Sequence, residues 1–276
     1  MPGQISKSRV ALPVSLVFAA LMLRAAKAPS SQNVDVSQIV RQSAQVTLAD
    51  RKASSNYDYY ETDREPGGSK TYSVLMLDGS PYRRLVAVNG APLSQSKQEE
   101  EKKKLQDEIA RRKQESAEDR ARRLADFQKD EDRDLRFIRE FSEAFQFRLL
   151  AVRQLGTHHV YVIQATPLPG YKATDRESEV LTGMQGRLFV DKDTYHWVQA
   201  EAEVIHPVSI EGFLATVEPG TRFELDKAPV DAGVWLPTHF LMTSNAKVLG
   251  LFRHRDHQNE TYSKYRKVNA SGLQPE

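Results

Sequence analysis

The sequence contains no cysteine. Disulfide bonds, thiolate metal sites and cysteine nucleophiles are therefore excluded. A lipid-modified cysteine after a signal is excluded for the same reason, so the chain cannot itself be an acylated lipoprotein. The apolar run from Val10 to Leu23 is shorter than the roughly 20 residues that a membrane span requires.

Motifs that carry chemistry are also missing. The chain has no Gly-x-Ser-x-Gly elbow, no glycine-rich phosphate loop and no His-Glu-x-x-His zinc motif. The paired carboxylates Asp191 and Asp193 lie in a turn signal and need no acid-base role. The sequence therefore offers no catalytic residue and no cofactor site, and it favours a protein that is not an enzyme.

The histidines come closest to a catalytic or metal-binding signal. His254 and His257 flank Asp256, while His158 and His159 are adjacent. On a strand, neighbours one or three residues apart point to opposite faces, so neither set forms an obvious metal site. We interpret them as surface histidines.

Net charge also limits the partners. The formal charge is +2, but four of the Lys and Arg residues lie within the first 28 residues, so the remainder carries a net charge of −2. Binding to nucleic acid requires clustered, unpaired cations. The balance therefore predicts no nucleic-acid partner.

The N-terminus has the order of an export signal. Lys7 and Arg9 precede the apolar run, and the small residues of Ala26 to Ala28 follow it. This order predicts a signal peptide over residues 1–28 and a periplasmic or secreted protein. Because Arg24 follows the run at once and Pro29 follows the best cleavage site, an uncleaved inner-membrane tether is the alternative.

Two kinds of periodicity follow the signal. Apolar residues at helical spacing predict an amphipathic helix over Val34 to Ala53. From Tyr57 the period changes to two, with strands at Tyr72 to Met76 and Tyr82 to Val88 on either side of the turn Asp78 to Pro81. We expect a helix that covers a meander of about three strands.

The stretch from Lys97 to Glu140 has a different composition. It holds 14 Lys plus Arg and 14 Asp plus Glu in 44 residues, with no glycine or proline, which predicts solvated helix. Seven acid-to-base pairs stand four residues apart, each contributing about 0.2 to 0.5 kcal/mol. They are Glu99/Lys103, Glu100/Lys104, Asp107/Arg111, Glu108/Arg112, Glu118/Arg122, Asp119/Arg123 and Asp132/Arg136.

Capping signals and apolar content divide this charged insertion, which we place at residues 95–145. Capping boxes begin at Ser96 and Ser116, so we expect a break in the middle. Leu105 and Ile109 are nearly the only apolar residues of the first half, whereas a stripe runs along the second. We therefore expect the second half to dock and the first to project. The segment is interpreted as a solvated helical hairpin; the alternative is a coiled coil or an arm that binds an envelope protein.

Beyond Phe145 the sequence predicts nine short strands separated by turn signals. They cover Phe147 to Val152, His159 to Ala165, Gly186 to Val190, Trp197 to Val204, Gly212 to Val217, Thr221 to Leu225, Val234 to Thr243, Val248 to Arg253 and Tyr262 to Val268. Many short strands at this spacing favour an antiparallel sandwich or barrel over a parallel sheet.

Three stretches in the last third carry a family resemblance. They read GMQGRLFVDKDTYHWVQAEAEV, EPGTRFELDKAPVDAGVWLPTHFLMTS and ETYSKYRKV, between Gly183 and Val268. Their order resembles the LolA-like superfamily of periplasmic proteins, which includes carriers in outer membrane lipoprotein sorting. More closely, it looks like an uncharacterised group of secreted bacterial proteins. The charged insertion has no counterpart in the carriers.

The resemblance implies a fold of mainly β structure with helices. It would be a half-open antiparallel β-barrel, formed by residues 29–276 as one domain, with an N-terminal helix across its concave face. It also implies lipid binding: an apolar ligand, or the acyl chain of a lipoprotein, held by a periplasmic carrier or sensor. The alternative is an envelope interaction protein that works through its charged helical arm.

Alternation sorts the candidate ligand-binding residues. Along the strand Trp197 to Val204, one face carries small and branched apolar side chains, and the other carries Trp197 and the polar residues. The expected inward set is Val198, Ala200, Ala202, Val204, Phe223, Phe240, Met242 and Phe252. Small residues beside large ones would leave room for a lipid chain, although a filled core would show the same alternation.

Overall fold

The computed structural model describes residues 35–176, 178–209, 215–248 and 252–268. Residues from Asp35 onward form one compact unit. The predicted signal over residues 1–28, with its cleavage site, lies outside the described residues. Within the described stretches, no helix combines the length and the apolar content that crossing a membrane would require.

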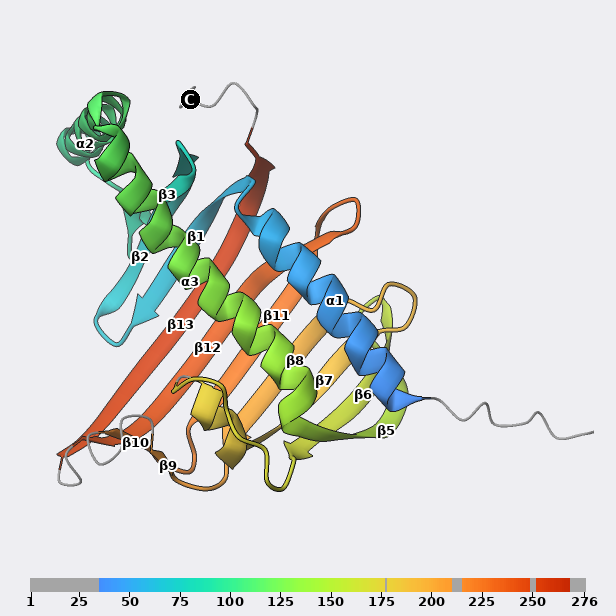
Figure 1. The fold of residues 1–276 in the computed structure, drawn as a ribbon. Helices are drawn as coiled ribbons and strands as arrows, with labels where there is room; N and C mark the ends of the chain where they lie inside the picture. The colour runs from blue at the N-terminus through green and yellow to red at the C-terminus, as the bar shows by residue number, and fades with distance from the viewer. Residues whose placement is uncertain (1–34, 177, 210–214, 249–251, 269–276) are drawn as a thin grey trace, which may run out of the picture. The chain divides into compact units, whose positions relative to one another are not determined.

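The strands form a single antiparallel sheet with two separate edges (Figure 1). Its order is β4-β3-β2-β1-β13-β12-β11-β8-β7-β6-β5, and the short β9 and β10 extend β12 at one end. The strands are β1 (Tyr57–Glu65), β2 (Gly68–Leu77), β3 (Ser80–Val88), β4 (Ala91–Pro92), β5 (Phe145–Leu155), β6 (His158–Pro167), β7 (Met184–Asp191), β8 (Trp197–Val204), β9 (Val208–Ser209), β10 (Ala215–Val217), β11 (Arg222–Asp231), β12 (Val234–Val248) and β13 (Phe252–Lys267).

This architecture confirms the predicted fold class, an α+β protein built on an unclosed antiparallel sheet. The meander after the first helix is present as β1, β2 and β3. One strand assignment was wrong, because the strands expected at Val248 to Arg253 and Tyr262 to Val268 do not form separately. Val248 ends β12, residues 249–251 lie outside the described residues, and Phe252 to Lys267 form one long strand, β13, which pairs with β12 from Phe252 to Thr261. Residues 254–261 are mostly polar and showed no alternation of apolar residues, but they form the middle of β13.

Helix α1 (Val36–Ser54) forms where helical spacing predicted it. The side chain of Asp35 caps its N-terminus by accepting a hydrogen bond from the backbone N–H of Gln38. Its buried face carries Ile39, Val40 and Ala44 toward the sheet. The helix therefore covers the sheet by burying one apolar stripe.

The charged insertion forms two helices, α2 (Gln95–Gln114) and α3 (Ala117–Ala144). The break between them is at the predicted place, and Ser116 caps α3 by accepting from the backbone N–H of Asp119. The box predicted at Ser96 was wrong, because α2 begins earlier, after Ser94, without a side-chain cap.

Helix α2 does not project from the sheet, which contradicts the expectation for the first half of the insertion. Its single strong apolar anchor, Leu105, is 2% exposed and packs against Leu75 and Leu77 of β2. The Arg112 side chain is also buried and donates to the backbone carbonyls of Leu77 and Ser80, at 2.5 and 2.9 Å. Leu105 and Arg112 thus dock a helix whose other residues are mostly charged or polar.

Ion pairs along the insertion follow the sequence pattern only in part. Three of the seven predicted pairs form, namely Glu100/Lys104, Glu108/Arg112 and Glu118/Arg122. Other cations turn to tertiary partners instead. Arg123 pairs with Asp78 in the β2–β3 turn, and Arg136 pairs with Asp175. These contacts anchor the insertion to the sheet and the loops.

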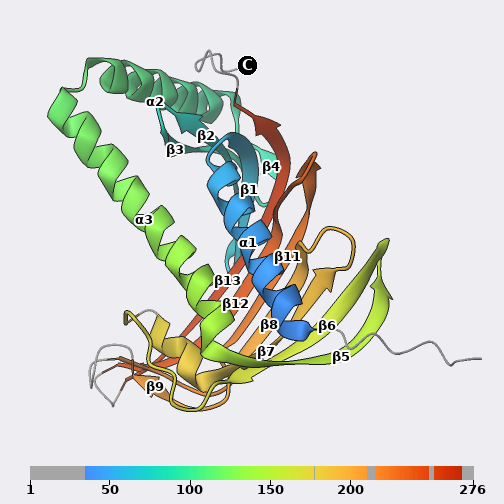
Figure 2. The same cartoon turned by 45° about the vertical axis from the view of Figure 1, so that its right-hand side comes forward.

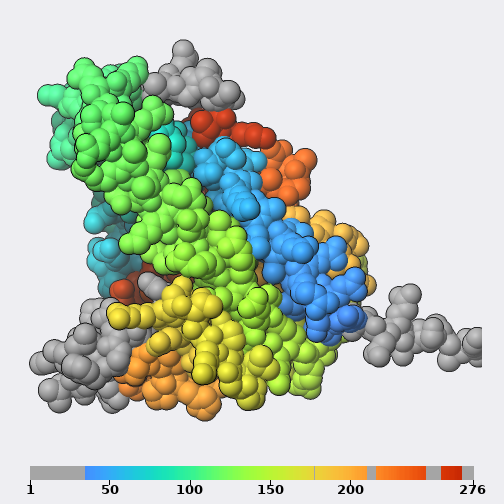
Figure 3. All heavy atoms as spheres, in the orientation of Figure 1, coloured from blue at the N-terminus to red at the C-terminus, as the bar shows by residue number. Residues whose placement is uncertain are grey.

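Helices α1 and α3 lie side by side on one face of the sheet (Figures 2 and 3). Arg51 of α1 joins them, because its guanidinium lies 2.7 Å from both Glu131 and Asp134 of α3. We call the face of the sheet beneath these two helices the helix-facing side.

The helix-facing side is densely filled toward β5, β6, β7 and β8. One cluster joins Ile39 and Val40 of α1 to the strands, and a second joins the end of α3 to the short 3-10 helix η1 (Ser178–Gly183). We call these two clusters the filled end. Its buried members are Ile39, Val40, Ile163, Leu188, Val190, Trp197, Ala144, Phe145, Ala165, Val180, Leu181, Met184 and Val204.

Candidate functional site

Most of the predicted ligand-binding residues do share the helix-facing side, with one correction on β8. Ala200 packs against the first cluster of the filled end, and Ala202 and Val204 belong to the second. Val198 instead packs with Phe189 on the opposite face, while Trp197 turns toward α1. The expectation for Val198 was therefore wrong.

A β-bulge explains the error. The pairing of β7 with β8 shifts between Phe189 and Val190, whose partners are Gln199 and Trp197. The extra residue reverses the alternation, so Trp197 joins Ala200 on the helix-facing side. The indole N–H of Trp197 then donates to the Ser43 hydroxyl of α1, at 3.2 Å. The pattern of apolar residues gave no indication of this β-bulge.

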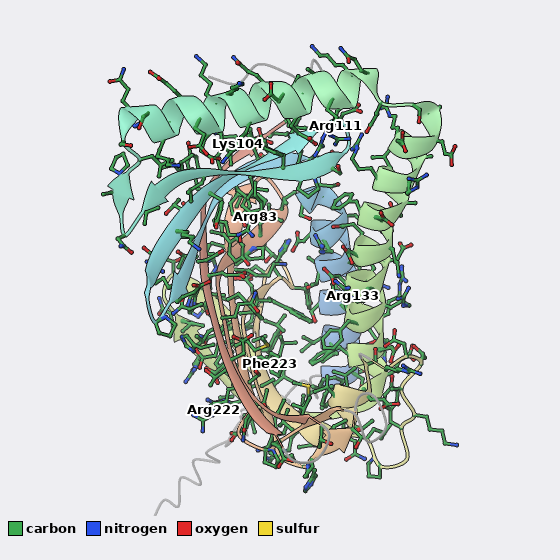
Figure 4. All side chains as sticks on the ribbon, turned by 90° about the vertical axis from the view of Figure 1, so that its left-hand side faces the viewer. Arg83, Lys104, Arg111, Arg133, Arg222 and Phe223 are labelled. Carbon is green, nitrogen blue, oxygen red and sulfur yellow. The ribbon has the colours of Figure 1, made fainter. Side chains whose placement is uncertain are left out.

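Strands β11 and β12 continue the helix-facing side with larger apolar residues. Phe223 pairs with Met242, and Leu225 pairs with Phe240, so all four share one face. Figure 4 shows Phe223 pointing from the sheet toward the helices, whereas its neighbour Arg222 points away from them. Phe223 therefore points to the helix-facing side, and its role in ligand binding stays a prediction. The side chain of Phe252 lies outside the described residues.

These residues are less covered than the filled end. Phe223 packs against the edge of the second cluster. Leu225, Phe240 and Met242 remain partly exposed, and among the described residues they belong to none of the buried clusters. We call Phe223, Leu225, Phe240 and Met242 the half-buried strip. It is an apolar surface beneath the helices that the protein's own side chains leave incompletely covered.

An acidic group continues the same face beyond the strip. Glu260 of β13 pairs with Phe240, and it also pairs with Asp63 of β1. Carboxylate oxygens of Glu61, Asp63 and Glu260 lie within 4.8 Å of one another. Arg83 of β3 reaches Glu61 at 2.5 Å and Asp63 at 2.8 Å. Figure 4 shows Arg83 on the same side of the sheet as Phe223.

Protonation of this group differs from that of exposed acids. Burial raises the pKa of Glu61 to about 7, against the opposing effect of Arg83, and the nearby Asp63 and Glu260 add to the rise. Burial also raises the pKa of Tyr59 to about 12. Tyr262 has a raised pKa because of its burial and its hydrogen bond to Glu260. At neutral pH, Glu61 is therefore partly protonated.

A second polar group lies beneath the C-terminal half of α1. Asp50 accepts from the ammonium of Lys227 on β11 at 2.7 Å and from the backbone N–H of Trp235 on β12 at 3.0 Å. His196 lies 3.5 Å from the other oxygen of the salt-bridged carboxylate. The side chains of Asp50, His196 and Lys227 are 2%, 7% and 5% exposed. We call these three residues the buried junction.

The opposite face of the sheet carries a hollow of about 490 Å³. Its lining includes Gln164, Gln185, Arg187, Glu201, Glu203, Arg222 and Glu224. These side chains alternate with the helix-facing ones, so most of the lining lies on the face away from α1 and α3. The hollow is mainly polar, and it shares only Phe223 with the half-buried strip.

Sequence reasoning missed both polar groups beneath the helices. Glu61 and Glu260 stand in tyrosine-rich strands, in YETD and NETY, where an acidic residue on an aromatic face is a usable signal. Lys227 similarly interrupts the face that Phe223 and Leu225 begin. Lysines on buried strand faces are rare unless they are paired, so this position could have been flagged. The residues that contact Glu61, Glu260 and Lys227 from other strands and helices could not have been predicted from the sequence.

No protein-family model matches this chain, and a search of curated proteins finds no match either. Among solved structures, the chain is similar to a LolA superfamily protein from Nitrosomonas europaea, with 11% identity over 82% of this chain and 94% of that one, at a TM-score of 0.28. It is also similar to a DUF1329 family protein from Desulfovibrio piger, with 10% identity, 85% and 95% coverage and a TM-score of 0.28.

A third similar structure is a domain from Vibrio parahaemolyticus, described as an outer membrane lipoprotein-sorting protein. It shares 11% identity over 85% of this chain and 95% of that one, at a TM-score of 0.29. The fold of this chain is defined by its own strand pairing and helix packing.

Proposed function

We propose that this protein binds an apolar ligand, a lipid or an acyl chain, on the helix-facing side of its sheet, as a carrier or a sensor. The observation that carries the proposal is the half-buried strip. Phe240 and Met242 lie on the helix-facing side but stay partly exposed, whereas β6 and β7 carry fully buried residues on that side, such as Ile163 and Leu188. Covering such a surface yields about 25 cal/mol per Å².

The surroundings of the strip favour a ligand with one polar end. Toward β8 the face narrows to small residues, where Ala202 lies between Gly186 and Phe223. Toward β1 it ends at the acidic group and Arg83. An apolar chain along the strip would therefore have its end beside charged and hydroxyl groups. The charged groups at this end of the strip favour an amphiphilic ligand over a wholly apolar molecule.

The docked insertion weakens the alternative that the charged segment is a free arm. Leu105 and Arg112 hold α2 on β2 and β3, and Arg51 ties α3 to α1. The exposed face of the insertion stays highly charged. Contact of this segment with an envelope protein therefore has no specific structural support.

The experiment compares two neighbouring residues of β12 that point to opposite faces. Met242→Asp places a charge in the half-buried strip, while Leu241→Asp places the same charge on the other face at a similarly half-buried position. Binding of a fluorescent fatty acid should weaken at least tenfold, about 1.4 kcal/mol, in the first variant only. Equal binding by both variants would refute the site.

The natural ligand can be sought in protein recovered from the periplasm of a bacterial host. Lipid that co-purifies with the wild type, and is absent from Met242→Asp, should be identified by mass spectrometry. Export is itself a proposal that rests on the order of Lys7 to Ala28, and recovery from the cytosol with Met1 retained would contradict it. Wild-type protein free of lipid and unable to bind the probe would indicate a purely structural sheet.

A further inference from the structure

The buried junction joins α1 to the sheet through charges rather than through apolar contact. Asp50 is the only acidic residue on the buried face of α1, and it receives both the Lys227 ammonium and a backbone N–H of β12. A buried ion pair of this kind contributes little net stability, but removal of one partner is costly because the other charge is left unpaired. The position of α1 therefore depends on the charge balance at Asp50.

His196 is the unexplained member of this junction. Both of its ring nitrogens are buried, and neither has a hydrogen bond of full geometry; acceptors near the ring are the Asp50 carboxylate, at 3.5 Å, and the backbone of Gly233. The imidazole stacks on the Trp235 indole, with ring centroids 5.0 Å apart and an interplanar angle of 13°. Buried polar groups without partners are rare in native proteins and call for an explanation. A role for His196 that depends on its protonation would explain why its ring nitrogens are buried in this way.

Charged groups face His196 from several elements. Asp50 lies on α1, Lys227 on β11, and Asp191 ends β7. Asp191 is already engaged, because it accepts from the Thr194 backbone and hydroxyl and pairs with His158 of β6 at 3.0 Å. The hydroxyl of Thr47, also on the buried face of α1, has no hydrogen-bond partner. Asp50 is thus the nearest carboxylate available to an imidazolium.

The charge balance follows from these contacts. With neutral His196, the Asp50 carboxylate and the Lys227 ammonium cancel. Protonation of His196 places two cations beside one carboxylate in a site from which water is largely excluded, and such an unpaired charge is unfavourable. Movement of α1 away from the sheet would rehydrate all three groups.

We propose that the buried junction is a proton-sensitive attachment of α1 to the sheet, in which protonation of His196 loosens the helix. The inference goes beyond the proposed ligand and does not rest on it. Burial lowers the pKa of His196, in agreement with this direction, against the opposing effect of Asp50. The folded state therefore takes up this proton less readily than the unfolded chain, and stability is lost as pH falls below about 6.5.

Hydrogen exchange of the α1 amides, residues 36–54, tests the proposal. After correction for the intrinsic rate, exchange in the wild type should be at least about threefold faster at about pH 5.5 than at about pH 7.5. His196→Gln should lose most of this ratio. His239→Gln, which removes a histidine beside Asp226 on another part of the sheet, should keep it. An unchanged ratio in His196→Gln would overturn the proposal.

A second variant gives an effect of opposite sign. Lys227→Met leaves Asp50 without its cation at neutral pH, so protonated His196 becomes its best partner. In this variant, α1 should exchange more slowly at the lower pH, which reverses the wild-type response. Arg51 and Glu131, which also link α1 to α3, are unchanged in both variants. A Lys227→Met protein that loosens on acidification like the wild type would also overturn the proposal.

Discussion

The two parts of the helix-facing side are built by different rules. The filled end uses only apolar residues from α1, α3, η1 and four strands, and several of them are completely buried. The half-buried strip has large apolar residues of the same kinds, but α3 packs against α1, η1 and β3 rather than along β11 and β12, and only α1 packs against β12. Apolar side chains of the same types are thus fully covered in the filled end and partly exposed in the half-buried strip.

This difference separates stability from binding. Side chains at the filled end meet neighbours on every side, so their loss leaves a cavity. Side chains of the strip have neighbours on the sheet but incomplete cover above it. The first region should therefore dominate the free energy of unfolding, and the second should tolerate substitution. Variants at matched positions in the two regions test this difference.

The largest effect is expected at Ile163 of β6, which is 0% exposed in the filled end. Ile163→Ala should lower the free energy of unfolding by about 2 to 5 kcal/mol, because it removes packed methylene groups and leaves a cavity. Phe240→Ala, a larger truncation in the strip, should cost less than Ile163→Ala. Urea denaturation of both variants measures the difference. Equal losses would mean that the strip is packed as tightly as the core.

The next effect concerns the docking of α2. Arg112→Met removes the donor for the Leu77 and Ser80 carbonyls and leaves Glu108 without this partner. We expect a loss of about 2 to 3 kcal/mol, because buried acceptors lose their hydrogen bonds. Arg111→Met provides the control, since Arg111 is 54% exposed and pairs only along the insertion. Thermal unfolding that affects both variants equally would contradict docking through Arg112.

The smallest effect should depend on pH. The folded pKa of Glu61 is raised to about 7, so its protonated form contributes stability that is complete below the unfolded pKa and is lost as pH rises to about 7. Glu61→Gln removes this dependence. Between about pH 4.5 and pH 8, the wild type should lose on the order of 1 to 2 kcal/mol relative to the variant. Parallel pH profiles of the two proteins would show that Glu61 titrates normally.

Much of the fold could be predicted from periodicity, because that signal is local. Helical spacing located α1, alternation located most strands, and the Ser116 cap located the break in the insertion. Alternation also placed Phe223 on the correct face. These features depend on residues within a turn or two of one another, so the pattern of neighbours is sufficient to specify them.

The failures have a common physical origin in contacts between distant segments. Docking of α2 needs only Leu105 and Arg112, and a count of apolar residues gives too little weight to two well-placed anchors. The bulge beside Trp197 reverses a face without changing composition. The buried junction joins α1 to β11 across 177 residues. Single-sequence patterns contain no information about such partners.

The position of β13 affects how the protein can be made. It is the last of the described strands in chain order, yet it stands inside the sheet, between β1 and β12, with Tyr57 opposite Lys267. During synthesis from the N-terminus, β1 to β3 can join the other strands only after β13 has been made, because β13 pairs with β1 on one side and β12 on the other. Pairings this far apart in sequence form slowly and leave strand edges exposed to aggregation. Loss of β13 would divide the sheet into two pieces, so the continuity of the whole sheet depends on one strand that is made after all the described strands it joins.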